Sequence, residues 1–215
     1  VVAVSLKKEA SNKEGWLSGL LSQIVDREDT GMTLAVAFPV PAGEEIPQSF
    51  VVRVQGEHPA CVAEATSATE AASASEGGGG YLVRCYGFHE DTVHPDRYQP
   101  ELEEELRKIT DDYDPDVIHC FGTEYPHTLA VCRVYPHPER ILLGIQGICS
   151  LCAEAYFADL PERVTRKVTF RDLVKRDSLR SQQEKFVRRG VMEREAIGLA
   201  GNITGRTAWD REVTT

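Results

Sequence analysis

One stretch decides the fold expected for this chain: Asp114-Pro-Asp-Val-Ile-His-Cys-Phe-Gly-Thr-Glu-Tyr-Pro-His-Thr-Leu-Ala130. Residues 116–121 form an apolar run bounded by turn residues, which predicts a buried strand. Pro126 then suits the first turn of a helix, where a missing N–H group costs nothing. In an α/β sheet the ligand crevice lies just beyond the carboxyl ends of the strands. Three polar residues are expected at that place: Thr123, Glu124 and His127.

Strand and helix patterns alternate along the rest of the chain. Apolar runs predict strands at 32–38, 50–54, 81–86, 141–146 and 202–205, the first of them buried on both faces. Helical spacing of apolar residues predicts helices at 16–27, 98–113 and 124–134, and a longer region at 169–199 broken near Gly190. Such alternation favours right-handed crossovers. We therefore predict an α/β fold, a single Rossmann-like three-layer sandwich with a mainly parallel sheet and with Ile118 and Ile145 in central strands.

Three further segments bear on how the domain is organised. Residues 63–80 are rich in Ala, Ser, Thr and Glu and end in four glycines, which predicts a mobile surface excursion. A phosphate-binding loop is disfavoured there, because the Lys-Ser/Thr of a P-loop is missing. Val1–Leu6 is the one candidate for an opening strand, and 206–215 has the pattern of a helix that is just beginning. We therefore expect residues 1–215 to be one domain of a longer protein.

Charge and composition narrow the class of protein. A net charge of −10 over 215 residues argues against a general nucleic-acid binder, which needs a basic surface. No apolar run approaches the roughly 20 residues of a membrane-spanning helix. The six cysteines are interpreted as small core residues in a reducing compartment, although redox or metal roles stay open. Cys149-Ser-Leu-Cys152 lacks the second cysteine pair of a zinc site.

The charge is unevenly distributed. Residues 162–194 hold eleven Lys/Arg against five Asp/Glu, a local charge of +6. One interpretation is a basic amphipathic helix that makes peripheral contact with an anionic membrane, since Phe170 and Leu173 alternate with Arg171 and Lys175. The other interpretation, which we favour, is a helix packed on the core with a solvated basic outer face.

A parallel sheet would bring three loops to one edge. They are 11–16, the loop after Phe121, and 144–148. Gly15 before a helix leaves backbone N–H groups free to meet an anion or a sugar hydroxyl. Glu124 and His127 are three residues apart, so one helical turn would place them together to bind hydroxyls or move a proton. The alternative is a first-turn carboxylate that complements the helix dipole beside a packed histidine. His119 is interpreted as a core histidine.

These motifs resemble those of a known family. Ala10-Ser-Asn-Lys-Glu-Gly-Trp-Leu-Ser-Gly-Leu20, Pro115-Asp-Val-Ile-His-Cys-Phe-Gly-Thr-Glu-Tyr-Pro-His127, Ile145-Gln-Gly147 and Gly205-Arg-Thr-Ala-Trp-Asp-Arg211 are similar to stretches in the N-terminal half of family 4 glycosyltransferases. The closest likeness is to bacterial members that act in surface-polysaccharide assembly. The resemblance implies a GT-B enzyme, in which one Rossmann-like domain binds the acceptor and a second binds the nucleotide-sugar. That second domain is absent from residues 1–215, so this part alone is expected to be inactive.

The resemblance also implies roles for individual residues. Glu14 and Gly15 would lie near the donor phosphates, and His127 would lie close to the transferred sugar. Glu124, placed beside His127 by the spacing alone, is the second catalytic candidate. The remaining substrate-binding candidates are Trp16, Gly122, Thr123, Gln146, Gly147 and Arg206. Gly15, Glu124, His127 and Gly147 are expected to line one cleft. No metal or cofactor is expected beyond the nucleotide-sugar, which is a substrate.

The implied partners are a nucleotide-sugar donor and a glycan or lipid-linked acceptor, in the cytoplasm or at the inner face of the membrane. Retention of configuration is what the family suggests, and the sequence names neither sugar nor acceptor. A Rossmann-like ligand-binding or regulatory domain without catalysis is the alternative. A nicotinamide enzyme is disfavoured, because no G-x-G-x-x-G follows a strand.

Overall fold

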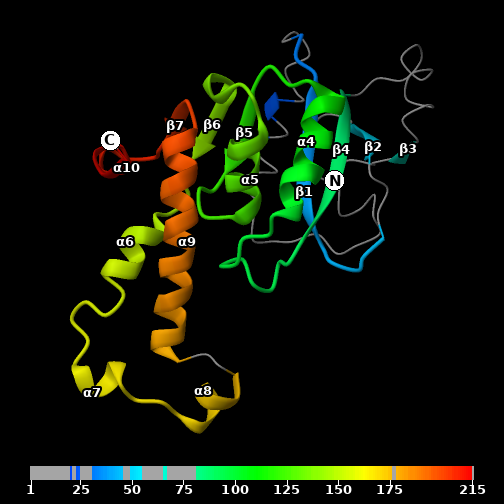
Figure 1. The fold of residues 1–215 in the computed structure, drawn as a ribbon. Helices are drawn as coiled ribbons and strands as arrows, with labels where there is room; N and C mark the ends of the chain where they lie inside the picture. Colours follow the sequence, from blue (N-terminus) through cyan, green and yellow to red (C-terminus); the bar gives the residue numbers. More distant parts are fainter. Residues whose placement is uncertain are drawn as a thin grey trace. The chain divides into compact units, whose positions relative to one another are not determined.

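The computed structural model describes residues 20, 23–24, 31–45, 49–54, 65–66, 81–175 and 178–214 (Figure 1). The chain divides into two compact units, residues 1–88 and 89–215, and each is described by itself. The predicted strand at 1–6 lies outside the described residues, as do most of the helix at 16–27 and of the excursion at 63–80. One domain over residues 1–215 stays a prediction.

The first unit is built on a four-stranded sheet. Its strands are β1 (Leu34–Pro41), β2 (Ser49–Val54), β3 (Ala65–Thr66) and β4 (Tyr81–Glu90), in the order β1-β4-β2-β3. Phe50, Val52, Val83 and Cys85 form its buried core, and Leu34, Val36 and Phe38 of β1 pack against that core. Cys85 is 0% exposed, as predicted for a core cysteine, and this burial raises the pKa of its thiol to about 12.

This sheet differs from the predicted one. Strand β2 pairs antiparallel with both β3 and β4, so the described strands do not form a single mainly parallel sheet. Antiparallel strands can be joined by a short connection, whereas a parallel pair needs a crossover of a dozen or more residues, usually helical. Strand β1 was also predicted to be buried on both faces, and only Val40 in it is buried. An antiparallel sheet can leave one face in solvent, which explains the difference.

The second unit holds a parallel sheet with helices. Its elements are α4 (Glu101–Tyr113), β5 (Ile118–Phe121), α5 (Pro126–Val134), η2 (Pro138–Arg140), β6 (Ile141–Gly144), α6 (Cys149–Glu154), α7 (Glu162–Thr165), α8 (Phe170–Lys175), α9 (Leu179–Leu199), β7 (Asn202–Thr204) and α10 (Ala208–Thr214). The strand order is β5-β6-β7, and both pairings are parallel. The protein is therefore a mixed α/β structure with one all-parallel sheet.

The two strands predicted to be central have different places. Strand β6 is the middle strand, and Ile145 follows its last residue with only 2% of its surface exposed. Strand β5, which carries Ile118, lies at an edge of the described sheet and is only half-buried. His119 in β5 is exposed and lies against the Phe121 ring, so its interpretation as a core histidine was wrong. An edge strand has a neighbour on one side only, which leaves such side chains uncovered.

Two helices end where the sequence predicted and begin two or three residues later than predicted. Helix α4 buries Leu102, Leu106 and Thr110 on one face and ends at Asp114, whose left-handed backbone lets its N–H group reach the Thr110 carbonyl. Helix α5 begins at Pro126 and buries most of its length. Helix α4 packs on α5, and α5 and α6 pack on α9 (Figure 1).

The long helical region differs from its prediction. Helix α9 runs unbroken through Gly190, and a separate short helix, α8, precedes it. A Cβ atom at Gly190 would lie 2.7 Å from the Cα atom of Ser150, so the glycine permits a close crossing of α9 and α6. Gly190, which predicted a break in the helix, is instead required for the close packing of α9 on α6.

We expect Gly190→Ala to lower the free energy of unfolding by about 1–3 kcal/mol, because the new methyl group must push the Ser150 backbone away. Gly198→Ala is the matched control, since a Cβ atom there meets nothing within 4 Å and α9 gains a better helix former. Urea unfolding of both variants measures the difference. Equal stabilities would contradict the close crossing.

Candidate functional site

Three loops meet at the carboxyl edge of the parallel sheet. They follow β5, β6 and β7 and span 122–125, 145–148 and 205–207. The Gly122 N–H group donates to the Gly144 carbonyl at 2.8 Å, and the Ile145 N–H group donates to the Thr204 carbonyl at 2.9 Å. The Arg206 guanidinium donates to the Gln146 carbonyl. The loops therefore bring together six of the predicted site residues: Gly122, Thr123, Glu124, Gln146, Gly147 and Arg206.

The other predicted residues divide into two groups. Glu14, Gly15 and Trp16 lie outside the described residues. His127 lies in the second unit, at the start of α5. The loop that contains Glu124 leads directly into this helix, but Glu124 and His127 have different partners.

A sharp turn at Gly122 shapes the first loop. Gly122 has a φ of +99°, which L side chains rarely adopt. A Cβ atom there would lie 2.7 Å from the Tyr125 ring and 3.0 Å from Oε2 of Glu124. The Thr128 hydroxyl donates to the Gly122 carbonyl at 2.9 Å and ties the turn to α5. Both the backbone conformation and the space require glycine at this position.

Glu124 forms a buried ion pair with an arginine of α9. One terminal nitrogen of Arg189 lies 3.3 Å from Oε1 of Glu124, whose residue surface is 8% exposed. Among the described residues, the buried atoms Oε2 of Glu124 and Nε of Arg189 have no hydrogen-bond partner. The Arg189 guanidinium also lies 5.4 Å from the centre of the Tyr125 ring. Burial raises the pKa of the Glu124 carboxyl, and Arg189 opposes that shift.

His127 pairs with a carboxylate that sequence reasoning missed. Its Nδ1 atom lies 3.0 Å and 3.1 Å from the two carboxylate oxygens of Glu90, the last residue of β4. The His127 backbone N–H group also donates to Glu90 at 3.3 Å. Glu90 is only 4% exposed, and the Tyr125 ring stacks on the imidazole with 5.2 Å between ring centres. The ring position is therefore held from two sides, with Nδ1 facing the carboxylate.

The predicted pairing of Glu124 with His127 is therefore corrected. Tyr125, in an extended conformation, is the N-cap of α5, so Glu124 precedes the helix and does not share a helical face with His127. Glu124 takes Arg189 as its partner, and His127 takes Glu90. No local sequence signal marks Glu90, because it ends a strand far from both residues along the chain.

A second missed residue, Glu193 of α9, is fully buried. Its carboxylate accepts hydrogen bonds from the N–H groups of Cys149 (2.7 Å) and Ser150 (3.0 Å) at the start of α6. It also accepts from the hydroxyls of Ser150 (2.7 Å) and Thr123 (3.3 Å). One carboxylate thus caps α6 and holds the loop after β5.

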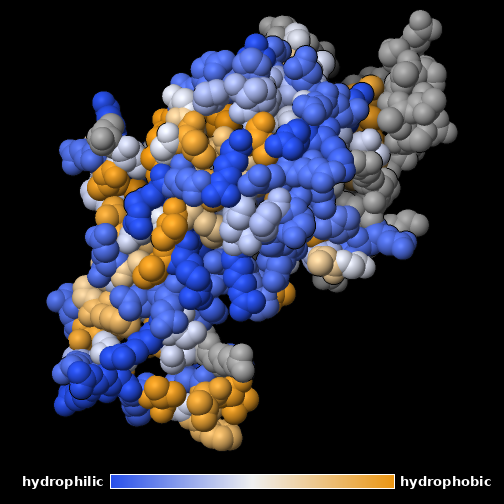
Figure 2. Space-filling view, in the orientation of Figure 1, coloured by the Kyte–Doolittle hydropathy of each residue, from blue (hydrophilic) through white to orange (hydrophobic). Residues whose placement is uncertain are grey.

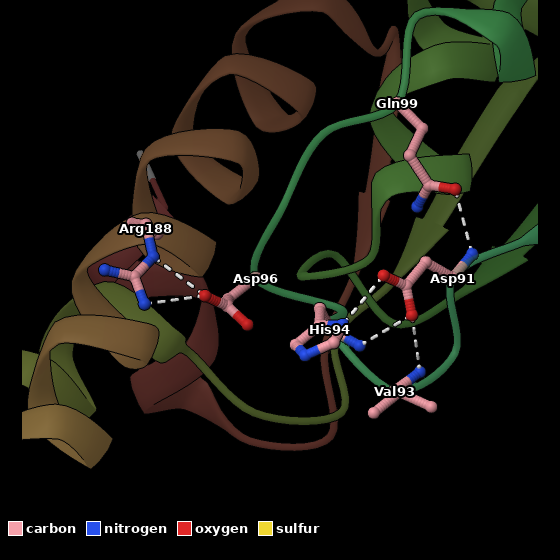
Figure 3. A network of polar contacts seen from close by, with 6 residues as sticks. All are labelled: Asp91, Val93, His94, Asp96, Gln99 and Arg188. Atoms are coloured by element: carbon pink, nitrogen blue, oxygen red, sulfur yellow. Dashed lines mark hydrogen bonds and ion pairs between the residues drawn. The ribbon is translucent and has the colours of Figure 1, made fainter. Parts of the chain in front are cut away.

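The loop that follows Glu90 is held by its own polar network (Figure 3). The Asp91 carboxylate accepts from the backbone N–H groups of Val93 and His94 and pairs with His94 Nδ1 at 2.8 Å. The His94 hydrogen bond is the main cause that lowers the pKa of Asp91. Further along, the buried carboxylate of Asp96 accepts from Arg188 of α9 at 2.7 Å and 2.8 Å. The loop is thereby tied to the same helix that supplies Arg189 and Glu193.

The described residues offer no metal site, since no three His, Cys, Asp or Glu side chains gather in a way that could hold an ion. Within the described part of the chain, the cysteines form no disulfide, and burial raises the pKa values of Cys132 and Cys149 to about 12. Among the helices that are described, none is long and apolar enough to cross a membrane.

Comparisons with models of known families, with curated proteins and with solved structures found no match. The description of the site therefore rests on the structure alone, which shows polar side chains at the carboxyl edge of a parallel sheet.

We expect Glu193→Gln to lower the free energy of unfolding by about 2–3 kcal/mol, because the amide NH₂ group would face donors that now meet a carboxylate. Glu195→Gln is the matched control on the same helix. Its partly exposed carboxylate pairs with Arg133, and such pairs contribute about 1 kcal/mol or less. Chemical denaturation of both variants makes the comparison. A loss at Glu193 no larger than at Glu195 would contradict the capping role.

The raised pKa of Glu124 predicts a pH dependence of stability. A carboxyl whose folded pKa is raised contributes most below its ordinary pKa, and the contribution is lost as pH rises through the folded pKa. The free energy of unfolding of the wild type, relative to Glu124→Gln, should therefore fall as pH increases from about 4.5. Loss of the charge partner of Arg189 in the variant changes the free energy of unfolding by an amount that does not vary with pH in this range. If the difference in free energy of unfolding between wild type and variant stays constant with pH, the environment of Glu124 does not disfavour the charged carboxylate.

Proposed function

We propose that residues 1–215 are the acceptor-side, Rossmann-like domain of a GT-B glycosyltransferase similar to family 4 enzymes. The complete protein would transfer a sugar from a nucleotide-sugar to a glycan or lipid-linked acceptor in bacterial cell-surface polysaccharide synthesis. The proposal starts from the sequence resemblance. One structural observation supports it beyond the motifs: a histidine held by a buried carboxylate lies next to a buried Glu–Arg pair at the carboxyl edge of a parallel sheet.

The chemistry of sugar transfer suits such a site. An acceptor hydroxyl forms a bond to the anomeric carbon, the bond from that carbon to the diphosphate breaks, and the hydroxyl loses its proton. Groups that donate and accept hydrogen bonds must hold the sugar hydroxyls in reacting position. His127, whose Nδ1 atom lies 3.0 Å from Glu90, supplies a positioned imidazole, a group able to exchange a hydrogen bond or a proton with a hydroxyl. Glu124 and Arg189 supply a carboxylate and a guanidinium beside it, paired with each other at 3.3 Å.

The three loops have complementary roles in this proposal. Gly147 is exposed, and a Cβ atom there would meet nothing within 4 Å, so a sugar ring can approach the main chain closely at this loop. Thr123 is 0% exposed and bonded to Glu193, so it acts as a support for the loop and not as a direct contact. Arg206 spans from the loop after β7 to the Gln146 carbonyl and closes the edge. Glu14, Gly15 and Trp16 keep their proposed place near the donor phosphates.

The decisive experiment uses the full-length protein, because closure of two domains positions donor against acceptor in GT-B enzymes. A panel of nucleotide-sugars is scored for release of nucleoside diphosphate, with and without glycan acceptors. Release with one of these donors is the expected result. If none of them reacts and the chain binds a small ligand without turnover, the alternative of a non-catalytic binding domain gains support.

In the full-length protein we expect His127→Ala to lower turnover by about 10²-fold or more, the usual effect of losing a positioned polar or acid–base group. The matched control is His137→Ala. His137 also lies beside a carboxylate, 3.3 Å from Glu139, but it precedes β6 at the opposite, amino edge of the sheet. Wild-type turnover in His127→Ala, or an equal loss in the control, would return His127 to a structural role.

A further inference from the structure

Residues 160–175 carry an exposed surface that is both apolar and basic, and we call it the apolar-basic surface. Six of its large apolar side chains are exposed, by 39% to 82%: Leu160, Val164, Val168, Phe170, Leu173 and Val174. Figure 2 shows the orange patch over α8 next to the blue surface of α7. Helices α7 and α8 bury no residue at all, so the sequence interpretation of a core-packed helix was wrong for this segment.

The charges of this surface are of one predominant sign. It holds five basic residues, Arg163, Arg166, Lys167, Arg171 and Lys175, against two acidic ones, Glu162 and Asp172. Both acidic side chains have partners within the segment. Glu162 pairs with Arg166, and Asp172 accepts from the Thr169 N–H group at 2.9 Å. The segment therefore has a net charge of +3 in a chain whose total is −10.

We propose that the apolar-basic surface docks on an anionic lipid bilayer. Exposed Phe, Leu and Val side chains enter the boundary between headgroups and acyl chains, while the Lys and Arg side chains next to them reach the lipid phosphates. The negatively charged remainder of the chain is repelled by such a membrane, so this segment sets the orientation. A symmetric contact between the same surfaces of two copies fits less well, because it would place one +3 surface against another. The inference does not rest on the proposed function.

Helix α9 connects the proposed membrane contact with the candidate site. Helix α9 begins next to α8 and continues to the carboxyl edge, where it supplies Arg189 and Glu193 (Figure 1). A bilayer bound at α8 therefore lies at the opposite end of a rigid helix from β7.

The test is co-sedimentation of the full chain with vesicles of phosphatidylcholine alone or of equal parts phosphatidylcholine and phosphatidylglycerol. We expect binding to the anionic vesicles that weakens as salt is added. Arg171→Gln with Lys175→Gln should lower the partition coefficient about 25-fold at low salt, roughly fivefold for each charge. Phe170→Ser with Leu173→Ser should lower it about tenfold or more, because the inserted apolar area is lost.

The charge-matched control is Arg107→Gln with Lys108→Gln on α4, which changes the net charge equally and should alter binding less than twofold. Circular dichroism confirms that each variant is folded, as expected for exposed positions. Equal binding to neutral vesicles, or no binding to anionic ones, overturns the proposal. Self-association that the Phe170 and Leu173 changes abolish, without vesicle binding, assigns the surface to a second copy.

Discussion

The carboxylate of Glu193 is the interaction on which the arrangement of the carboxyl edge depends. Helix α6 has only six residues, and its N-cap residue, Ile148, offers no side-chain acceptor to the N–H groups of the first turn. Glu193 supplies that acceptor from another helix and also accepts from Thr123. A buried charge is costly unless donors surround it, and four donors surround this one. The same contact therefore joins α9 to the loops after both β5 and β6.

Two neighbouring arginines of α9 form ion pairs with two further loops. Successive residues of a helix point roughly 100° apart, so Arg188 and Arg189 leave α9 in different directions. Arg188 reaches Asp96 in the loop after β4, and Arg189 reaches Glu124 in the loop after β5. Glu90, where β4 ends, then fixes His127. Helix α9 thus sets the positions of groups that come from elements far apart along the chain.

Much of this frame could be predicted from local sequence. Pro126 marks the start of α5 correctly, and parallel topology correctly brings residues 122–124 and 145–147 to one edge. The hydrogen-bond and ion-pair partners of these residues were harder to predict. They are set by long-range contacts, and an error of one or two residues in a helix start changes which side chains lie together. The expected helix start at 124 was two residues early, which was enough to pair Glu124 with His127 wrongly. Glu90 and Glu193 have no local signal, since their role exists only after the chain has folded.

Two buried carboxylates in this region differ in how far they are satisfied. Glu193 has donors on both oxygens and no exposure, the condition of a group that serves the fold. Glu124 has one oxygen without a partner among the described residues, and its own partner, Arg189, has a nitrogen in the same condition. Glu193 also raises the pKa of Glu124 by its charge. Burial of an incompletely bonded ion pair does little for stability. The Glu124–Arg189 pair therefore serves the fold less completely than Glu193 does, although both carboxylates contact the loop after β5 or belong to it.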